Sequence, residues 1–218
     1  MRPIASTLDH IVIVASALEE GVDFCEKKLG VKLAPGGEHI RVGTHNALLN
    51  LGSGVYMEVI AVNPKAAATD CPRWFGMDWP EQRKRAAGGP YLATFVARTN
   101  DISHAVTELS QLGPVRDMQR GALEWRITIR DDGALVEGGT LPTVIQWPDG
   151  AHPTQKMPAS GCSLVRLDVF HPQPTHLREA WRRIGLAEDE RLRIASAASS
   201  PPGLVAHVAT PAGIVTLN

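Results

Sequence analysis

The chain has 218 residues, of which 44% are hydrophobic, enough to bury a substantial core in one or two domains. Its 22 basic and 23 acidic residues give a formal net charge of −1, which argues against a nucleic-acid-binding face. Three cysteines without CxxC spacing disfavour a disulfide framework and a structural zinc site. No stretch approaches the ~20 apolar residues of a spanning helix, so we expect a cytoplasmic protein without a membrane partner.

One pattern occurs three times: an alternating apolar strand, an amphipathic helix, then two or three more short strands. The opening strands cover residues 8–15, 91–97 and 164–170. Their spacing predicts repeated βαβββ modules. We expect a first module at residues 1–64, a helical connector at 65–90, a second module at 91–150 and a third, divergent βαβββ-like module at 161–218.

Each module exposes an apolar sheet face and must pair with another copy. We therefore expect an α+β fold whose modules form a curved, mostly antiparallel sheet around a cleft. The opening strand of the third module, residues 164–170, is too apolar to remain an exposed edge. It should pair with the sheet of the first two modules or with its counterpart in a second subunit, so a homodimer is one expected assembly.

Two polar residues interrupt apolar strands of the first module. His10 shares a strand face with Val12 and Val14, which points it toward the cleft if the other face packs on the helix. Glu58 lies in the last strand, where a buried carboxylate should be paired or metal-bound. By itself, His10 could equally be a core histidine bonded to the backbone or to Glu58.

A hairpin signal at residues 52–54 suggests a third group. If Leu51 opposes Gly54, then Ala47 opposes Glu58, and His45 lies diagonally beside Glu58 on the same face. Two imidazoles and a carboxylate in one cleft would suit a divalent metal with open positions. Tyr56 faces the same way as Glu58, where it either orients an oxyanion or packs.

These features resemble the vicinal oxygen chelate superfamily, which includes glyoxalases, bleomycin resistance proteins and extradiol dioxygenases. The resemblance rests on Leu-Asp-His-Ile-Val-Ile-Val at residues 8–14, on the duplicated module and on the glutamate of the fourth strand. It covers about residues 7–155, and four segments are similar to the glyoxalase-like group. These segments are residues 43–48, 56–60, 73–76 and 141–147.

The resemblance implies an incomplete barrel with metal ligands in the first and last strands of each module. His10 then matches the first-strand ligand and Glu58 the fourth-strand ligand. In the second module only Gln146 could ligate or hydrogen-bond, so His45 would have to complete the site. Gln146 also reads as a polar lining residue, and Trp125 and Arg126 as substrate-binding groups for stacking and for anion attraction.

The function implied is a divalent-metal-dependent enzyme acting on a small substrate with vicinal oxygens, of the lyase/isomerase or dioxygenase type. Zn, Ni, Mn or Fe would be held by His10, His45 and Glu58, with Glu58 and Tyr56 in catalysis and no organic cofactor. Two alternatives remain open. One is a metal-free small-molecule binding or sequestering module, and the other is a degenerate structural subunit, favoured if side chains fill the cleft.

Overall fold

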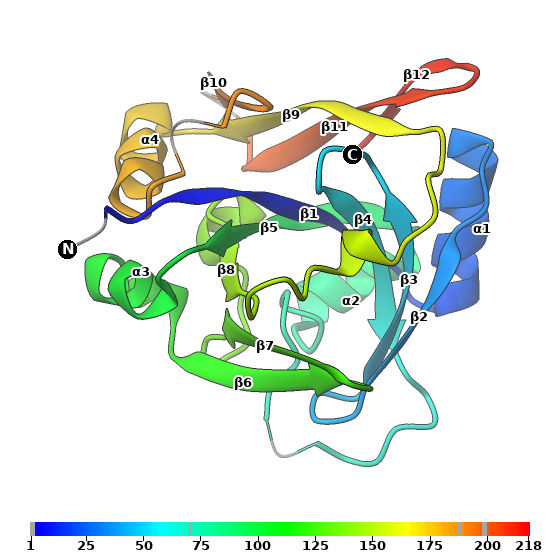
Figure 1. Cartoon of the computed structure of the whole chain (residues 1–218), viewed down its shortest axis with the longest axis horizontal. Helices are drawn as coiled ribbons and strands as arrows, with labels where there is room; N and C mark the ends of the chain where they lie inside the picture. The colour runs from blue at the N-terminus through cyan, green and yellow to red at the C-terminus, as the bar shows by residue number, and fades with distance from the viewer. Residues whose placement is uncertain (1–2, 70, 187–188, 198–199) are drawn as a thin grey trace.

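The computed structural model describes residues 3–69, 71–186, 189–197 and 200–218 (Figure 1). The first βαβββ unit comprises β1 (Ser6–Val14), α1 (Leu18–Leu29), β2 (Ala34–His39), β3 (Thr44–Asn50) and β4 (Tyr56–Val62). The second comprises β5 (Tyr91–Thr99), α3 (Ile102–Glu108), β6 (Val115–Arg120), β7 (Leu123–Thr128) and β8 (Thr143–Gln146). Short 3₁₀ turns cover Ser110–Leu112, Val136–Gly139 and Pro153–Gln155.

These two units form one curved sheet in the strand order β2-β3-β4-β1-β5-β8-β7-β6. The β1–β4 and β5–β8 pairs are parallel, whereas the remaining neighbours in this sheet run antiparallel. The expected α+β fold with a curved, mostly antiparallel sheet is therefore confirmed.

The β1 strand joins the two units and separates two cores. Ile11 and Ile13 pack in the larger core with α1, while Val12 and Val14 belong to the core on the concave side. A register shift against β5 leaves Asp9 without a partner between the Leu8 and His10 pairs. Such a bulge re-aims side chains locally, and here it allows Asp9 and His10, neighbours in sequence, to bond to one another.

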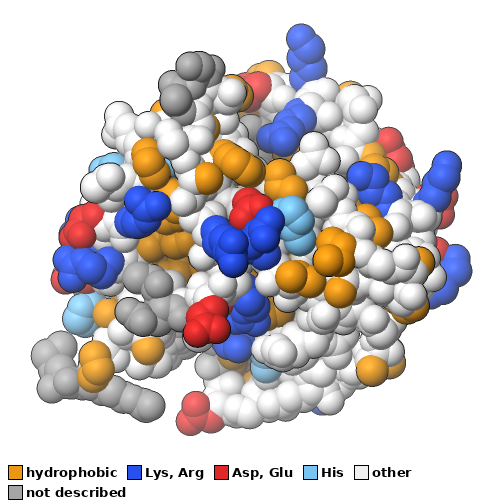
Figure 2. Space-filling view, turned by 90° about the horizontal axis from the view of Figure 1, so that it is seen from above, with side chains coloured by type: hydrophobic (Ala, Val, Ile, Leu, Met, Phe, Trp, Pro, Cys, Tyr) orange, Lys and Arg blue, Asp and Glu red, His pale blue; other side chains and the backbone are white. Residues whose placement is uncertain are grey.

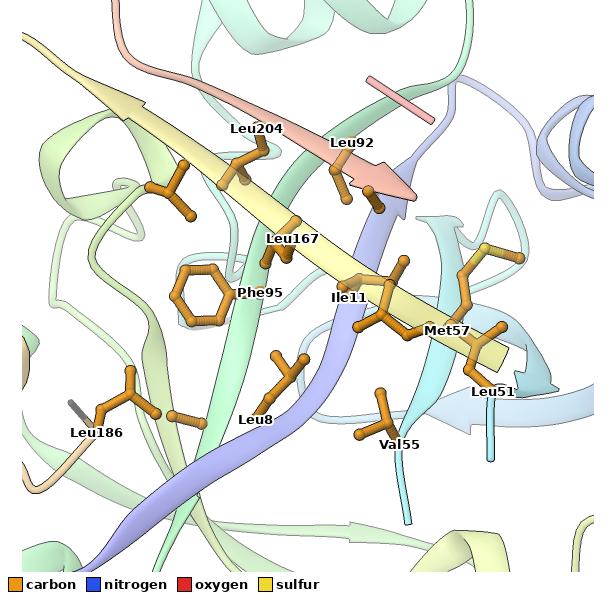
Figure 3. Close-up of a cluster of buried hydrophobic side chains, with 14 of the residues drawn as sticks. Leu8, Ile11, Leu51, Val55, Met57, Leu92, Phe95, Leu167, Leu186 and Leu204 are labelled. Carbon is orange, nitrogen blue, oxygen red and sulfur yellow. The ribbon is translucent and has the colours of Figure 1, made fainter. Parts of the chain in front are cut away.

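The third unit contains β9 (Ser163–His171), α4 (Pro174–Arg183), β10 (Leu192–Ser196), β11 (Gly203–Thr210) and β12 (Gly213–Leu217). It forms a separate four-stranded sheet in the order β10-β9-β11-β12. In Figure 1 this sheet lies above β1 and β5. Apolar side chains of the two sheets meet in one core, where Leu167 and Leu204 pack with Leu8, Ile11 and Phe95 (Figure 3).

The expectation that residues 164–170 pair with the large sheet is wrong. The β9 strand hydrogen-bonds to β10 and β11 within its own sheet. At the centre of the large sheet, β1 is already bonded to β4 and β5, so the third unit buries a face instead of an edge. Only β10 and β12 are edges of the small sheet.

The outward face of the small sheet is polar at its centre. Arg166 donates to Asp168 through Nε at 2.7 Å, and His207 Nε2 lies 2.8 Å from the other Asp168 oxygen. Figure 2 shows this side of the molecule, where charged side chains are interspersed with hydrophobic ones. Of the helices that the structure describes, none is long and apolar enough to cross a membrane.

The connector between the first two units is only partly helical. Its helix, α2, spans Pro80–Ala87. Before the helix, Trp74 and Phe75 are buried against the concave side of the large sheet, and Trp74 meets the His39 ring edge-on at 4.8 Å. The connector therefore contributes bulky side chains to the interior of the curved sheet.

Two substitutions in β9 test the face-to-face packing. Leu167 is fully buried and Val165 is 46% exposed. Leu167→Ala should lower the free energy of unfolding by about 2–5 kcal/mol because it leaves a cavity between the sheets. Val165→Ala is the matched control and should change it by less than about 0.5 kcal/mol. Urea unfolding measures both, and equal losses would contradict this packing.

Candidate functional site

A small chamber lies inside the curved sheet, with walls from both units and the connector. His10, Tyr56 and Glu58 line it from β1 and β4, and Trp125, Trp147 and Trp74 line it from the other sides. Its volume is about 20 Å³, room for about one water-sized group. Side chains therefore fill most of the space enclosed by the sheet.

The centre of the site is a histidine between two carboxylates. His10 Nδ1 lies 2.6 Å from Asp9 Oδ1, and His10 Nε2 lies 3.5 Å from Glu58 Oε2. All three side chains are buried, with exposed fractions of 3% for His10, 0% for Asp9 and 6% for Glu58. The expectation that His10 and Glu58 approach each other in one cleft is thus confirmed.

The protonation of this array follows from its geometry. Burial alone would lower the pKa of His10, but the hydrogen bonds and charges of Asp9 and Glu58 raise it to about 9. Burial opposes ionisation of Glu58, yet the contacts with His10 and Asn46 lower its pKa to about 2. The pKa of Asp9 is also held below its usual range despite burial, by His10 and His152. At neutral pH a cationic imidazole therefore lies between two anions.

The second oxygen of Asp9 accepts hydrogen bonds from the segment that follows β8. Asp9 Oδ2 accepts hydrogen bonds from Trp147 Nε1 at 2.9 Å and His152 Nε2 at 3.0 Å. Arg98 Nη1 lies 3.8 Å from the same Asp9 oxygen. This segment thereby closes over the chamber, with the His152 ring 5.9 Å from that of Tyr56. Asp9 and His152 were not predicted as site residues.

The second oxygen of Glu58 is held by Asn46. Asn46 Nδ2 donates to Glu58 Oε1 at 2.5 Å, while Asn46 Oδ1 accepts from Arg120 Nη1 at 3.1 Å. The Arg120 side chain comes from β6, at the opposite edge of the sheet. A polar path therefore crosses the chamber from one edge strand, through Asn46, to the His10–Glu58 pair.

Asn46 occupies the place predicted for His45 because the hairpin register differs by one residue. Leu48 opposes Glu58, so Asn46 is the diagonal neighbour on the same face. The turn contains three residues, with Leu51 N bonded to Val55 O at 2.9 Å. A shift of one residue sends each side chain to the other face, so the predicted Ala47–Glu58 pairing is wrong and His45 faces away.

Tyr56 holds the imidazole from one side. Its ring stacks on His10 with centroids 4.4 Å apart and an interplanar angle of 19°. Burial, with the nearby Asp9 and Glu58 charges, raises the pKa of the phenol well above 10, so Tyr56 stays neutral. Burial also lowers the pKa of His39, another residue of the chamber wall, to about 4, and that ring is neutral as well.

The three residues predicted to bind substrate border one open groove of about 950 Å³. Trp125 belongs to both the groove and the chamber, and its ring lies 5.4 Å from that of Trp147. Arg126 and Gln146 alternate with the chamber-lining Ile127 and Ile145, so they lie on the outer face of β7 and β8. Arg126 Nη2 donates to Gln146 Oε1 at 2.8 Å.

The donor atoms do not fit the expected divalent ion. The second unit presents Ile127 and Ile145 to the chamber, and neither can ligate a metal. His10 Nδ1 is bonded to Asp9. The His39 ring also lines the chamber, but its Nδ1 lies 3.0 Å from Thr44 Oγ1 and its Nε2 lies 3.5 Å from Asn46 Nδ2. Among the described residues this leaves His10 Nε2 and Glu58 as donors, fewer than the three protein ligands of a catalytic zinc site. Within the described ranges no three His, Cys, Asp or Glu residues are grouped to hold an ion.

The pH dependence of stability tests the ionised array. The His10 contribution is complete below pH 6.5 and is lost as pH rises through about 9, because the folded state holds that proton more tightly. The Glu58 contribution is complete above pH 4.5 and is lost as pH falls through about 2. The free energy of unfolding, measured with urea, should therefore contain a maximum from this pair between pH 4.5 and 6.5.

Removing the His10 cation should lower the free energy of unfolding between pH 4.5 and 6.5. His10→Ala leaves two buried carboxylates without it and should destabilise the fold by roughly 3–5 kcal/mol at pH 6. In the same variant, the free energy of unfolding should no longer fall as pH rises through about 9. His104→Ala, on the surface of α3, is the matched control. A wild type whose stability does not fall above pH 6.5 would contradict the assigned charge.

The comparisons with known proteins agree with the geometry of the fold. The model of the glyoxalase-like domain family matches residues 8–185. A hypothetical protein from Staphylococcus aureus has a similar structure, with 19% identity, coverage of 88% of this chain and 86% of that one, and a TM-score of 0.61. No curated protein matches the chain.

Two methylmalonyl-CoA epimerases also have related structures. The enzyme from Mycobacterium tuberculosis is 21% identical over 65% of this chain and 87% of its own, with a TM-score of 0.42. A second epimerase, bound to methylmalonyl-CoA and NH4+, is 17% identical over 68% and 99%, with a TM-score of 0.44. Since the family match runs from β1 through α4, the chain belongs to the glyoxalase-like domain family.

Proposed function

We propose that the chain is a small-molecule enzyme that moves a proton on a carbonyl compound, with His10 and Glu58 as the reacting pair. The observation that carries the proposal is the buried His10 ring between two carboxylates at the wall of a chamber. Burying an ion pair stabilises a fold no better than well-packed apolar residues do. Strongly shifted pKa values beside a cavity instead favour a chemical role.

The pair has one acid and one base in the required charge states. Glu58 removes a proton from the carbon next to the carbonyl, the C–H electrons form the C=C bond, and His10 Nε2 gives its proton to the carbonyl oxygen. Glu58 then returns its proton to the same carbon, or to the former carbonyl carbon where the first carbon carries a hydroxyl group. His10 recovers its proton from the oxygen that becomes the carbonyl. Because the His10 charge keeps the pKa of Glu58 low, Glu58 becomes a stronger base once His10 has released its proton.

The surrounding residues have supporting roles in this proposal. Tyr56 fixes the plane of the His10 ring through the stacked contact. Trp125, Arg126 and Gln146 bind the body of the substrate in the groove outside the chamber. The partner is a small molecule, and no step requires a metal ion. A cytoplasmic location and a homodimeric assembly stay predictions.

A metal-free binding or sequestering module is the second candidate. The observation that favours it is the contrast between the filled chamber of about 20 Å³ and the groove of about 950 Å³. Such a protein would bind a ligand against Trp125 and Trp147 without converting it. A structural subunit, which the filled chamber also supports, would do neither.

Proton exchange distinguishes these functions before the substrate is known. Wild-type protein in D2O should accelerate exchange of the carbon-bound protons next to the carbonyl in at least one member of a panel of 2-oxo acids and hydroxyaldehydes, followed by ¹H NMR. Glu58→Gln should lower that rate by roughly 10²-fold or more because the base is lost. Glu124→Gln, a groove carboxylate outside the chamber, is the matched control.

The exchange rate should also fall as pH rises through about 9, where His10 loses its proton. If Glu58→Gln and Glu124→Gln behave alike, the assigned base is wrong. Binding without exchange would favour the sequestering module.

Metal addition gives an independent prediction. A bound ion at a hundredfold excess over its dissociation constant would stabilise the fold by about 2.7 kcal/mol. We expect Zn, Ni, Mn and Fe to cause no such stabilisation and no change in exchange rate. The His39 ring on the chamber wall is engaged by Thr44 and Asn46, which leaves two suitable donors among the described residues. Stoichiometric metal in the wild type that is absent from both His10→Ala and Glu58→Gln would contradict the metal-free proposal. It would support a metal-dependent enzyme instead.

A further inference from the structure

A cation borders the chamber without a carboxylate of its own. Arg120 lines the chamber, and its guanidinium makes one hydrogen bond, from Nη1 to the neutral Asn46 side chain. No carboxylate in the described part of the chain lies within ion-pair distance of it. The stem of Arg120 passes over Gly37, where an added Cβ would meet Arg120 Cδ at 3.0 Å. The backbone thus leaves room for Arg120 to reach the interior.

A tryptophan that lines the same chamber has a buried indole N–H without an acceptor among the described residues. Trp74 is 4% exposed and lines the chamber, and its Nε1 is buried with no hydrogen-bond partner among the residues described. Buried indole N–H groups usually find an acceptor. The chamber wall therefore has more hydrogen-bond donors than acceptors. Arg120 and Trp74 offer donors in the same wall as His10, whereas Glu58 already accepts from Asn46.

We infer that the chamber receives the carboxylate of an organic acid, held by Arg120 and Trp74 beside the His10–Glu58 pair. The inference rests on the proposed function and names its substrate class as a carboxylic acid with a neighbouring carbonyl group. The chamber has room for about one water-sized group, so it takes one oxygen of the carboxylate, while the other oxygen and the carbon lie toward the groove. The body of the acid lies in the groove, against the Trp125 and Trp147 rings.

Calorimetric titration with phenylglyoxylate tests this site. The probe carries a carboxylate, an adjacent carbonyl and an aromatic ring, and its methyl ester is the matched neutral compound. Wild type should bind phenylglyoxylate more tightly than the ester or inorganic phosphate. Arg120→Gln should weaken binding of the acid by roughly tenfold or more, and Trp74→Phe by roughly fivefold, because each removes one donor.

Two controls change the same residue types outside the chamber. Arg116→Gln alters another arginine of β6, which lines neither the chamber nor the groove and whose Nη2 already donates to Asp131 Oδ1 at 2.7 Å. Trp79→Phe alters a connector tryptophan whose Nε1 already donates to the Asp132 carbonyl at 2.8 Å. Neither should change the affinity for phenylglyoxylate by more than about twofold.

Several results would overturn the inference: equal affinity for the acid and its ester, tighter binding of phosphate, or weakening by Arg116→Gln instead of Arg120→Gln. If Arg120→Gln fails to fold, Trp74→Phe decides the matter. Glu58→Gln separates this inference from the proposed reaction, since it should abolish exchange while preserving or tightening binding of the acid. Arg120-dependent binding without any exchange would refute the reaction and leave the carboxylate site intact.

Discussion

A protonated imidazole can be buried only where opposite charge is buried with it, and this requirement organises the site of the protein. Asp9 supplies one charge because a bulge in β1 removes it from the regular pairing. Glu58 supplies the other from β4, which runs parallel to β1. The two carboxylates then reach further, to Trp147 and His152 and to Asn46 and Arg120. One buried cation thus links both units of the large sheet and the segment that leaves it.

Closure of the curved sheet strengthens the electrostatic interactions between these charged groups. Across the seam between the edge strands, Arg41 from the β2–β3 turn donates to the Asp117 carbonyl of β6 at 2.9 Å, and Arg120 reaches back to Asn46. Trp74 and Phe75 fill the interior from the connector. Water is thereby excluded, so the interactions of His10 are little screened and its pKa departs far from that of a free imidazole. The groove outside stays open, and Trp125 and Trp147 line both the groove and the chamber.

The parts of the fold and site that follow from local periodicity could be predicted. Alternation of apolar residues located the opening strand of each unit and placed His10 and Glu58 on one interior face. Asp9 could not be found in this way, because strict alternation assigns it to the opposite face and the bulge is not visible in sequence. His45 was chosen over Asn46 since the Gly-Ser-Gly segment fits turns of different length, and one residue of register exchanges the two faces.

Contacts between residues far apart in the sequence could not be predicted either. Arg120 lies 74 positions from Asn46, and His152 lies 143 positions from Asp9, so no local pattern connects them. The apolar strand of the third unit was correctly expected to be buried, but hydrophobicity does not tell whether a strand is covered at its edge or on its face. Trp74 lies in one of the segments that resemble the glyoxalase-like group, but nothing in the sequence indicated that its N–H would lack an acceptor. Its unpaired N–H becomes meaningful only inside the chamber.

The central claim is that His10 is a cation enclosed by Asp9 and Glu58 at neutral pH. Nitrogen-15 NMR of the His10 ring measures this directly, because protonated and unprotonated imidazole nitrogens have well-separated shifts. At pH 7 both ring nitrogens should be protonated, and Asp9→Asn should lower the pH at which the first proton leaves, since Asp9 helps to hold it. A ring with one unprotonated nitrogen at pH 7 in the folded wild type would contradict the account.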